Sequence, residues 1–232
     1  MEIPDLKSVS IKQSAPEGSI AAFFDFDETL LAIDSASIGF KVLKEQGYLS
    51  KAFMLKMMGV MLLKKFGIVN EQVMARTFLG FYKGRDLKPF VDSALDFYEG
   101  YLQPNLSPRV VQKLEWHQQQ GHHTILVTGS IDYYLRPVQD DLGIDHLLCT
   151  HLEIGNNGLL TGRSKGPVCV GEAKVALMST LVAKYDLNLS DSYAYGNSEL
   201  DIPMLNQVGH PVIVNPTPGL LTYSKSKAWA EL

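Results

Sequence analysis

The chain has 232 residues, of which 46% are hydrophobic and 20% are charged, and its formal net charge is −4. This length and composition suit one large domain, or one domain with an insert, with enough apolar surface for a sizeable core. The mild acidity argues against non-specific nucleic-acid binding, which needs clustered positive charge. The two cysteines, Cys149 and Cys169, form neither a CxxC metal-binding pair nor a disulfide framework. We therefore expect a protein of a reducing compartment with no nucleic-acid partner.

Residues 1–19 form a polar lead-in that lacks the apolar region of a signal peptide. The most apolar stretch, residues 52–63, contains Lys56 and is shorter than the roughly 20 apolar residues of a membrane-spanning helix. These features predict a cytoplasmic protein with no integral membrane association.

Four short apolar runs are typical of strands buried on both faces of a parallel sheet: residues 20–24, 124–127, 193–195 and 211–214. Helical patterns separate the later runs over residues 108–120, 131–142 and 172–185, the first preceded by Ser107 as N-cap. This alternation predicts an α/β fold with a doubly wound parallel, Rossmann-like sheet. Ligands of such sheets bind at the carboxyl ends of the strands.

Two segments do not follow the alternation. Residues 34–104 have helical patterns throughout and are too long for a simple crossover, so we expect a helical cap inserted after the first strand. Residues 151–162 alternate around an Asn-Asn-Gly turn and predict a small β-hairpin. The expected organisation is therefore a lead-in (1–19), a core (20–33 and 105–232) and a cap (34–104).

The sharpest motif is Asp25-x-Asp27-x-Thr29, directly after the first buried run. Two carboxylates two residues apart on a turn can point into one site, where one attacks an electrophile and the other transfers a proton. A pair of helix-capping aspartates at a strand-helix turn is the alternative interpretation.

The other strand ends supply groups that complement such a nucleophile. Thr128 offers a hydroxyl and an adjacent backbone amide that suit a phosphoryl oxygen. Lys174 lies near a helix start, and Asn197 and Asp201 offer oxygen ligands for a hard cation such as Mg²⁺. Taken singly, each of these residues also fits a helix cap, a turn or a solvated surface position.

Four segments occur in order along the chain: DFDET, LVTGS, the lysine of GEAK, and GNSELDIPML. Together they resemble the motifs of the haloacid-dehalogenase superfamily, specifically its phosphoserine-phosphatase-like branch, from about residue 20 to residue 214. The resemblance implies a Mg²⁺-dependent phosphatase that hydrolyses a small phosphomonoester through an aspartyl-phosphate intermediate.

The same resemblance implies catalytic roles. Asp25 would attack phosphorus, and Asp27 would protonate the leaving oxygen and then activate water. Thr128 would hydrogen-bond the phosphoryl group, and Lys174 would balance negative charge. A dianionic phosphate repels an attacking carboxylate, so positive charge is needed at this position on physical grounds as well.

The implied Mg²⁺ ligands are the Asp25 carboxylate, the Asp27 backbone carbonyl and Asn197, with Asp201 binding directly or through water. The family usually has an aspartate where this chain has Asn197. The asparagine keeps a ligand oxygen but removes one negative charge, so we expect weaker Mg²⁺ binding. A phosphometabolite-binding protein that has lost turnover also stays open for this reason.

For substrate contacts, the resemblance indicates Asp34, nine residues after Asp25, where phosphoserine phosphatases carry a glutamate that binds the substrate ammonium. Arg76 falls near the cap arginine that holds a substrate carboxylate. Gly129 and Ser130, which follow Thr128, complete the predicted substrate-binding set. The shorter Asp34 side chain leaves the identity of the small phosphorylated metabolite open.

A stripe of methionines, with Met54, Met57, Met58 and Met61 at helical spacing, occupies the predicted cap. Such a stripe serves internal packing, a flexible apolar wall for a larger substrate, or a homodimer contact. The lysines that flank it also permit association with a membrane surface. A phosphotransferase that passes the phosphoryl group to an alcohol is the remaining enzymatic alternative.

Overall fold

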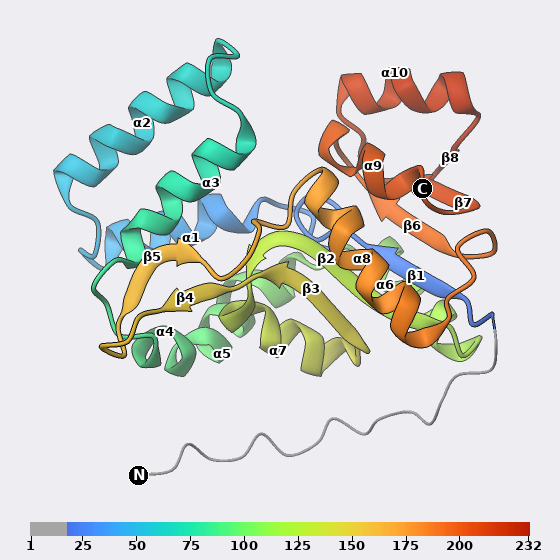
Figure 1. Cartoon of the computed structure of the whole chain (residues 1–232), viewed down its shortest axis with the longest axis horizontal. Coiled ribbons are helices and arrows are strands. Elements are labelled where there is room, and N and C mark those ends of the chain that lie inside the picture. Colours follow the sequence, from blue (N-terminus) through green and yellow to red (C-terminus); the bar gives the residue numbers. More distant parts are fainter. Residues whose placement is uncertain (1–17) are drawn as a thin grey trace.

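The computed structural model describes residues 18–232, so nearly all of the predicted lead-in lies outside the described residues. A six-stranded parallel sheet in the order β3-β2-β1-β6-β7-β8 crosses the molecule (Figure 1). Its strands are β1 (Ala21–Phe24), β2 (His123–Ile131), β3 (His146–Thr150), β6 (Tyr193–Gly196), β7 (His210–Ile213) and β8 (Ala230–Glu231). The predicted doubly wound parallel sheet is confirmed.

Helices cover both faces of this sheet because successive side chains of β1 point to opposite sides. Ala22 and Phe24 belong to the core cluster shared with two helices, α6 (Pro108–Gln119) and α7 (Asp132–Leu142). Ala21 and Phe23 belong to a second cluster, shared with α8 (Glu172–Tyr185), α9 (Ile202–Leu205) and α10 (Pro218–Lys227). Burial on both faces explains the continuous apolar run at residues 20–24.

The segment between β1 and β2 forms the predicted helical insert. Its α-helices are α1 (Ser35–Glu45), α2 (Lys51–Lys65), α3 (Glu71–Leu79), α4 (Lys88–Asp92) and α5 (Ala94–Phe97), followed by short turns of helix over Tyr98–Leu102 and Gln103–Asn105. In Figure 1, α2 and α3 rise as a pair away from the sheet. The two ends of the insert lie side by side, because Ala32 donates its amide to the Asn105 carbonyl at 2.8 Å.

The predicted hairpin is present as β4 (Leu152–Ile154) and β5 (Leu160–Ser164), which pair antiparallel. The Gly84 amide bonds the Leu160 carbonyl at 2.8 Å, so the hairpin ties the insert to the core. Gly162 has a φ of +79°, and a Cβ there would lie 2.8 Å from the Lys83 Cβ. Only glycine permits this close approach between the hairpin and the insert.

The structure differs from the sequence prediction at several strand boundaries. β2 does not end at residue 127 but continues through Thr128, Gly129 and Ser130, with a register shift against β3 between Val127 and Ile131. The strands β3 and β8 and the helix α10 were not predicted. β8 has only two residues, both exposed, so its strand character depends on pairing with β7 rather than on a local pattern.

No helix within residues 18–232 is long and apolar enough to cross a membrane.

Candidate active site

Three neighbouring strands, β1, β2 and β6, bring the predicted motifs to one edge of the sheet. The Asp25 amide donates to the Tyr195 carbonyl of β6 at 2.9 Å, which fixes the first residue beyond β1. A cavity of about 590 Å³ opens over this edge. Nine predicted site residues line it: Asp25, Asp27, Asp34, Thr128, Gly129, Ser130, Lys174, Asn197 and Asp201.

Lys174 joins two carboxylates at the bottom of the cavity. Its Nζ lies 2.6 Å from Asp25 Oδ1 and 2.6 Å from Asp201 Oδ1, and its side chain is 3% exposed. Burial and the charge of Asp201 raise the pKa of Asp25 to about 7, while Lys174 opposes that rise. Burial acts to lower the pKa of Lys174, but Asp201 and Asp25 outweigh it and hold that pKa above its usual value. The lysine therefore stays charged and favours the ionised form of Asp25.

Two serines hold the carboxylate of Asp27. The Ser35 amide donates to Asp27 Oδ1 at 2.7 Å, and the Ser130 hydroxyl donates to Asp27 Oδ2 at 2.8 Å. The hydroxyl oxygens of Ser35 and Ser130 are themselves 3.2 Å apart. Burial raises the pKa of Asp27 above its ordinary value although the serines oppose that shift. A carboxyl group with a raised pKa can carry a proton and release it during reaction.

Asp201 serves as an anchor for the loop after β6. Its Oδ2 accepts from the amides of Asn197 at 3.1 Å and Ser198 at 3.0 Å, while its Oδ1 faces Lys174. A Cβ on Gly196 would lie 2.6 Å from the Asp201 Cβ, so the glycine makes room for this carboxylate. With both oxygens engaged, Asp201 orients Lys174 and the Asn197 backbone in this arrangement.

The β2 residues present polar groups to the same space. Thr128 is 1% exposed, and its Oγ1 accepts the Ser130 amide at 3.1 Å. The carbonyl of Gly129 accepts the Thr150 hydroxyl at 2.8 Å. A Cβ on Gly129 would approach Val170 to 2.8 Å, so this position also needs glycine.

A family model described as haloacid dehalogenase-like hydrolase matches residues 22–206. The chain belongs to this family. It is 26% identical over 233 residues to a phosphoserine phosphatase of Mycobacterium tuberculosis, which covers 99% of this chain and 75% of that protein. The predicted resemblance to the family and to its phosphoserine-phosphatase-like branch is thereby confirmed.

Two further comparisons agree with this membership. The chain is 30% identical over 140 residues to a histidinol-phosphatase of Neisseria meningitidis serogroup C, covering 59% of this chain and 63%, less than two thirds, of that protein. A solved structure from Bordetella pertussis Tohama I, of a protein with unknown function, matches with a TM-score of 0.83 at 26% identity. That match covers 93% of this chain and 98% of the other.

Of the two cap residues predicted to bind substrate, Asp34 lines the cavity and Arg76 does not. Asp34 lines the cavity, but its carboxylate caps α1 by accepting the amides of Ala36 and Ser37, each at 3.2 Å. Arg76 is exposed on α3, and it is not among the residues that line the cavity, although the adjacent Ala75 is. The side chain of Arg76 is therefore exposed to solvent beside the cavity, and its contact with substrate stays a prediction.

Sequence reasoning assigned no role to Ser35, Glu28, Thr29 or Ser198. Thr29 is fully buried and donates its hydroxyl to Asp25 Oδ2 at 3.2 Å. Glu28 lines the cavity and accepts a hydrogen bond from Asn197 Nδ2 at 3.1 Å. Thr29, Glu28 and Ser198 lie within the DFDET and GNSELDIPML motifs, so their place in the sequence could have predicted that they belong to the site. Ser35 had only its place at the start of the insert to mark it.

The residues expected to hold Mg²⁺ have the ligand atoms that suit a hard divalent cation. Six acidic residues line the cavity, among them Asp25, Asp27, Glu28 and Asp201 of the core, against the two lysines Lys64 and Lys174, so the cavity has an excess of acidic groups. The Asn197 amide nitrogen faces Glu28, which leaves its carbonyl oxygen as a neutral ligand atom. Within residues 18–232 no three His, Cys, Asp or Glu side chains form a metal-binding group. A site built from Asp25, the Asp27 carbonyl and Asn197 is consistent with that finding, because two of its ligands are uncharged.

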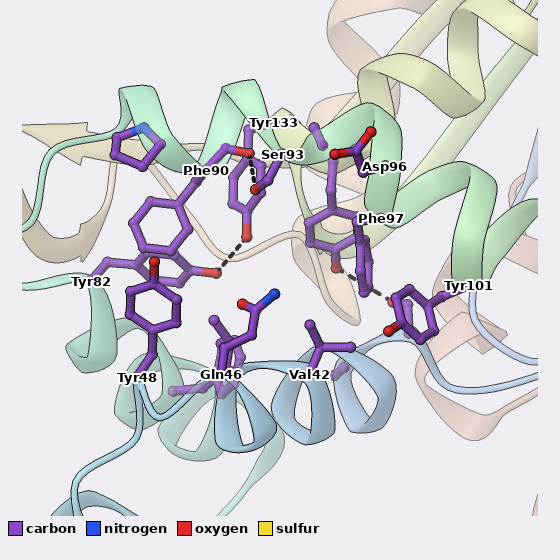
Figure 2. A pocket seen from close by; sticks show the side chains of 18 residues that line it. Val42, Gln46, Tyr48, Tyr82, Phe90, Ser93, Asp96, Phe97, Tyr101 and Tyr133 are labelled. Carbon is purple, nitrogen blue, oxygen red and sulfur yellow. Dashed lines mark hydrogen bonds between the residues drawn. The ribbon is translucent and has the colours of Figure 1, made fainter.

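A second cavity has a volume of about 640 Å³, and eight of the 18 residues that line it are aromatic (Figure 2). Figure 2 shows Val42 and Gln46 of α1 on one side of this space and Tyr133 on the other. Among the described residues that line it, Asp96 is the one charged residue. This second cavity lacks the lysine and the paired carboxylates that line the cavity over Asp25.

Proposed function

We propose that this chain is a Mg²⁺-dependent phosphomonoesterase that forms an aspartyl-phosphate on Asp25. The observation that supports it most is the Lys174 bridge, which favours the ionised form of Asp25 beside a second carboxyl group, Asp27, that can carry a proton. The names of the relatives agree, because a phosphoserine phosphatase and a histidinol-phosphatase both release phosphate from a phosphate ester.

In the first half of the reaction, an oxygen of Asp25 bonds to phosphorus and the bond from phosphorus to the alcohol oxygen breaks. Asp27 gives its proton to that leaving oxygen, as the raised pKa allows. The β2 groups at Thr128 and Gly129 orient the phosphoryl oxygens, and Lys174 stabilises their negative charge.

In the second half, water attacks the phosphorus of the aspartyl-phosphate, and the bond between phosphorus and the Asp25 oxygen breaks. Asp27, now ionised, takes a proton from that water. Ser35 and Ser130 keep the Asp27 carboxylate in one orientation throughout, so the same group serves as acid and then as base.

The Asp25 carboxylate, the Asp27 backbone carbonyl and the Asn197 amide oxygen would hold Mg²⁺. When bound, the ion supplies positive charge that offsets repulsion between a phosphate dianion and the attacking carboxylate.

The test is to quench turnover of a radiolabelled phosphomonoester in acid and to locate the labelled residue by peptide mapping. We expect Mg²⁺-dependent phosphate release and a label on Asp25. Turnover without label, or a label elsewhere, would overturn the proposed intermediate.

Steady hydrolysis of p-nitrophenyl phosphate would exclude a protein that only binds phosphometabolites. Added glycerol distinguishes the phosphotransferase alternative. If glycerol lowers phosphate release while nitrophenol release is unchanged or rises, the alcohol replaces water as the acceptor.

A further inference from the structure

The cavity over Asp25 has two chemically different halves. Its floor, defined by the polar core residues described above, binds phosphate in the proposed function. Its roof consists of lining residues from α1, α2 and α3, most of which are apolar: Phe40, Met57, Met61, Met74, Ala75, Phe78 and Leu79. The group attached to the phosphate must therefore contact thioether and aromatic surface.

The charged groups of the roof already have partners. Asp34 caps α1, and Lys64 of α2 forms an ion pair with Glu71 of α3. Lys64 and Lys174 are the two cationic residues among the described residues that line the cavity, and each is paired with carboxylates. A substrate with its own carboxylate would have to break one of these pairs, because Arg76 lies outside the cavity.

A hydrocarbon chain fits this roof better than an amino acid does. Burying each methylene contributes about 0.8 kcal/mol, and methionine side chains adapt to irregular apolar shapes. The volume of about 590 Å³ lies within the range of pockets that enclose molecules of moderate size.

The outward side of α2 is apolar as well. Leu55, Met58 and Leu62 are 66%, 63% and 55% exposed, and none of them lines the cavity. A helix that is apolar on both sides is normally buried. In Figure 1, α2 lies at the outer edge of the insert, away from the sheet.

The positive charge of α2 indicates which kind of partner contacts its outward face. Its 15 residues include four lysines and no acidic residue: Lys51, Lys56, Lys64 and Lys65. Exposed apolar side chains next to lysines match a lipid surface with anionic headgroups.

Resting on the proposed function, we propose that the substrate is a phosphomonoester with a hydrocarbon chain, taken from an anionic lipid surface on which α2 lies. The floor binds the phosphate, the roof buries the first part of the chain, and the outer face of α2 contacts the lipid.

The first arm of the test measures kcat/KM for butyl, hexyl and octyl phosphate below their micelle concentrations, with phosphoserine, histidinol phosphate and p-nitrophenyl phosphate for comparison. We expect kcat/KM to rise by up to about fourfold per methylene, and at least tenfold over the series. A flat series, or a preference for phosphoserine or histidinol phosphate, overturns the substrate class. If no ester is hydrolysed, not even p-nitrophenyl phosphate, the proposed function itself fails.

Met61→Gln and Met58→Gln form a matched pair for this arm. Both methionines are exposed on α2, at 59% and 63%, but only Met61 lines the cavity. Met61→Gln should reduce the chain-length dependence, whereas Met58→Gln should leave it intact. Equal effects of the two substitutions would contradict the assigned roof.

The second arm measures co-sedimentation with vesicles of phosphatidylglycerol and phosphatidylcholine, and with vesicles of phosphatidylcholine alone. We expect binding to the anionic vesicles and at least a tenfold loss of binding in Leu55→Ser/Met58→Ser/Leu62→Ser, with p-nitrophenyl phosphate turnover unchanged. No binding to anionic vesicles, or a dimer that the triple variant dissociates, overturns the lipid surface as the partner of α2.

Discussion

The floor and the roof of the active-site cavity are held in place by different interactions. On the floor, Lys174 is almost fully buried between two carboxylates, and Asp27 is fixed by two serines. In the roof, the ion pair between Lys64 and Glu71 is partly exposed, and Met61 is open to solvent. In the proposed function, the reacting groups therefore lie on strand ends with fixed hydrogen-bond partners, whereas the residues proposed to select the substrate lie on the more exposed helices of the insert.

The largest expected effect is that of Asp25→Asn on turnover. An amide cannot form an acyl-phosphate, so the rate with p-nitrophenyl phosphate should fall by about 10⁴-fold or more. Folding should be retained, because the amide oxygen can still accept the Thr29 hydroxyl. A rate within tenfold of that of the unmodified protein would show that Asp25 is not the nucleophile.

Asp27→Asn tests the second carboxyl group and should lower the rate by about 10²–10⁴-fold through loss of acid–base catalysis. The loss should be smaller for p-nitrophenyl phosphate than for an alkyl phosphate, because nitrophenolate leaves without a proton. Measured kcat values for the two esters check this. An equal loss with both esters would count against Asp27 as the general acid.

Comparing Lys174→Met with Lys64→Met sharpens the contrast between floor and roof. Removing the buried Lys174 leaves Asp25 and Asp201 unpaired, so the free energy of unfolding should fall by about 3–5 kcal/mol. Removing Lys64 breaks a partly exposed pair, for which about 0–1 kcal/mol is expected. Urea unfolding measures both. A similar decrease in the free energy of unfolding of the two variants would show that the ion pairs of the floor and of the roof contribute equally to stability.

The histidine contribution to the pH dependence of stability should come from the core, because residues 34–104 contain no histidine. His117 is fully buried, with Nε2 2.9 Å from the Tyr195 hydroxyl, and burial and His122 lower its pKa to about 3. The unfolded chain binds a proton near pH 6.5 and the folded chain does not, so stability is lost as the pH falls below that value.

Between pH 7 and pH 5 the free energy of unfolding should therefore fall by about 2 kcal/mol from this residue. His117→Gln should remove that part of the pH dependence, while His210→Gln, at an exposed position, should keep it. Denaturant titrations at the two pH values provide the measurement. An unchanged pH dependence in His117→Gln would assign the effect to other groups.

The smallest expected effect is that of Asn197→Asp on the Mg²⁺ requirement. The new carboxylate would lie next to Glu28, so the metal-free protein should lose thermal stability and Mg²⁺ should restore it. The Mg²⁺ concentration for half-maximal activity should fall several-fold, since ligand charge strengthens binding of hard cations. Mg²⁺ titrations of the activity and of the Tm measure these two effects. Glu28→Gln is expected to raise the Tm of the metal-free protein and to increase the Mg²⁺ concentration needed for half-maximal activity. An equal or higher Mg²⁺ requirement would exclude Asn197 as a ligand in this way.

The order of strands and motifs was readable from the sequence because each signal is local. Residues 20–24 are apolar on both sides because helices cover both faces of the sheet, and the same pattern marked β2, β6 and β7. The family motifs follow those strands, so Asp25, Thr128 and Asn197 were correctly expected to meet at one edge. The helical nature of residues 34–104 was also a local property.

Only the tertiary structure decided which residues from distant parts of the chain contact these site residues. The partnership of Ser35 with Asp27 and that of Glu28 with Asn197 depend on how the insert and the loops fold back, and no spacing in the sequence encodes that. The direction in which Arg76 points depends on how α3 is rotated against its neighbours. Local patterns are set by the backbone period and by burial, whereas contacts between distant segments follow from packing of the whole chain.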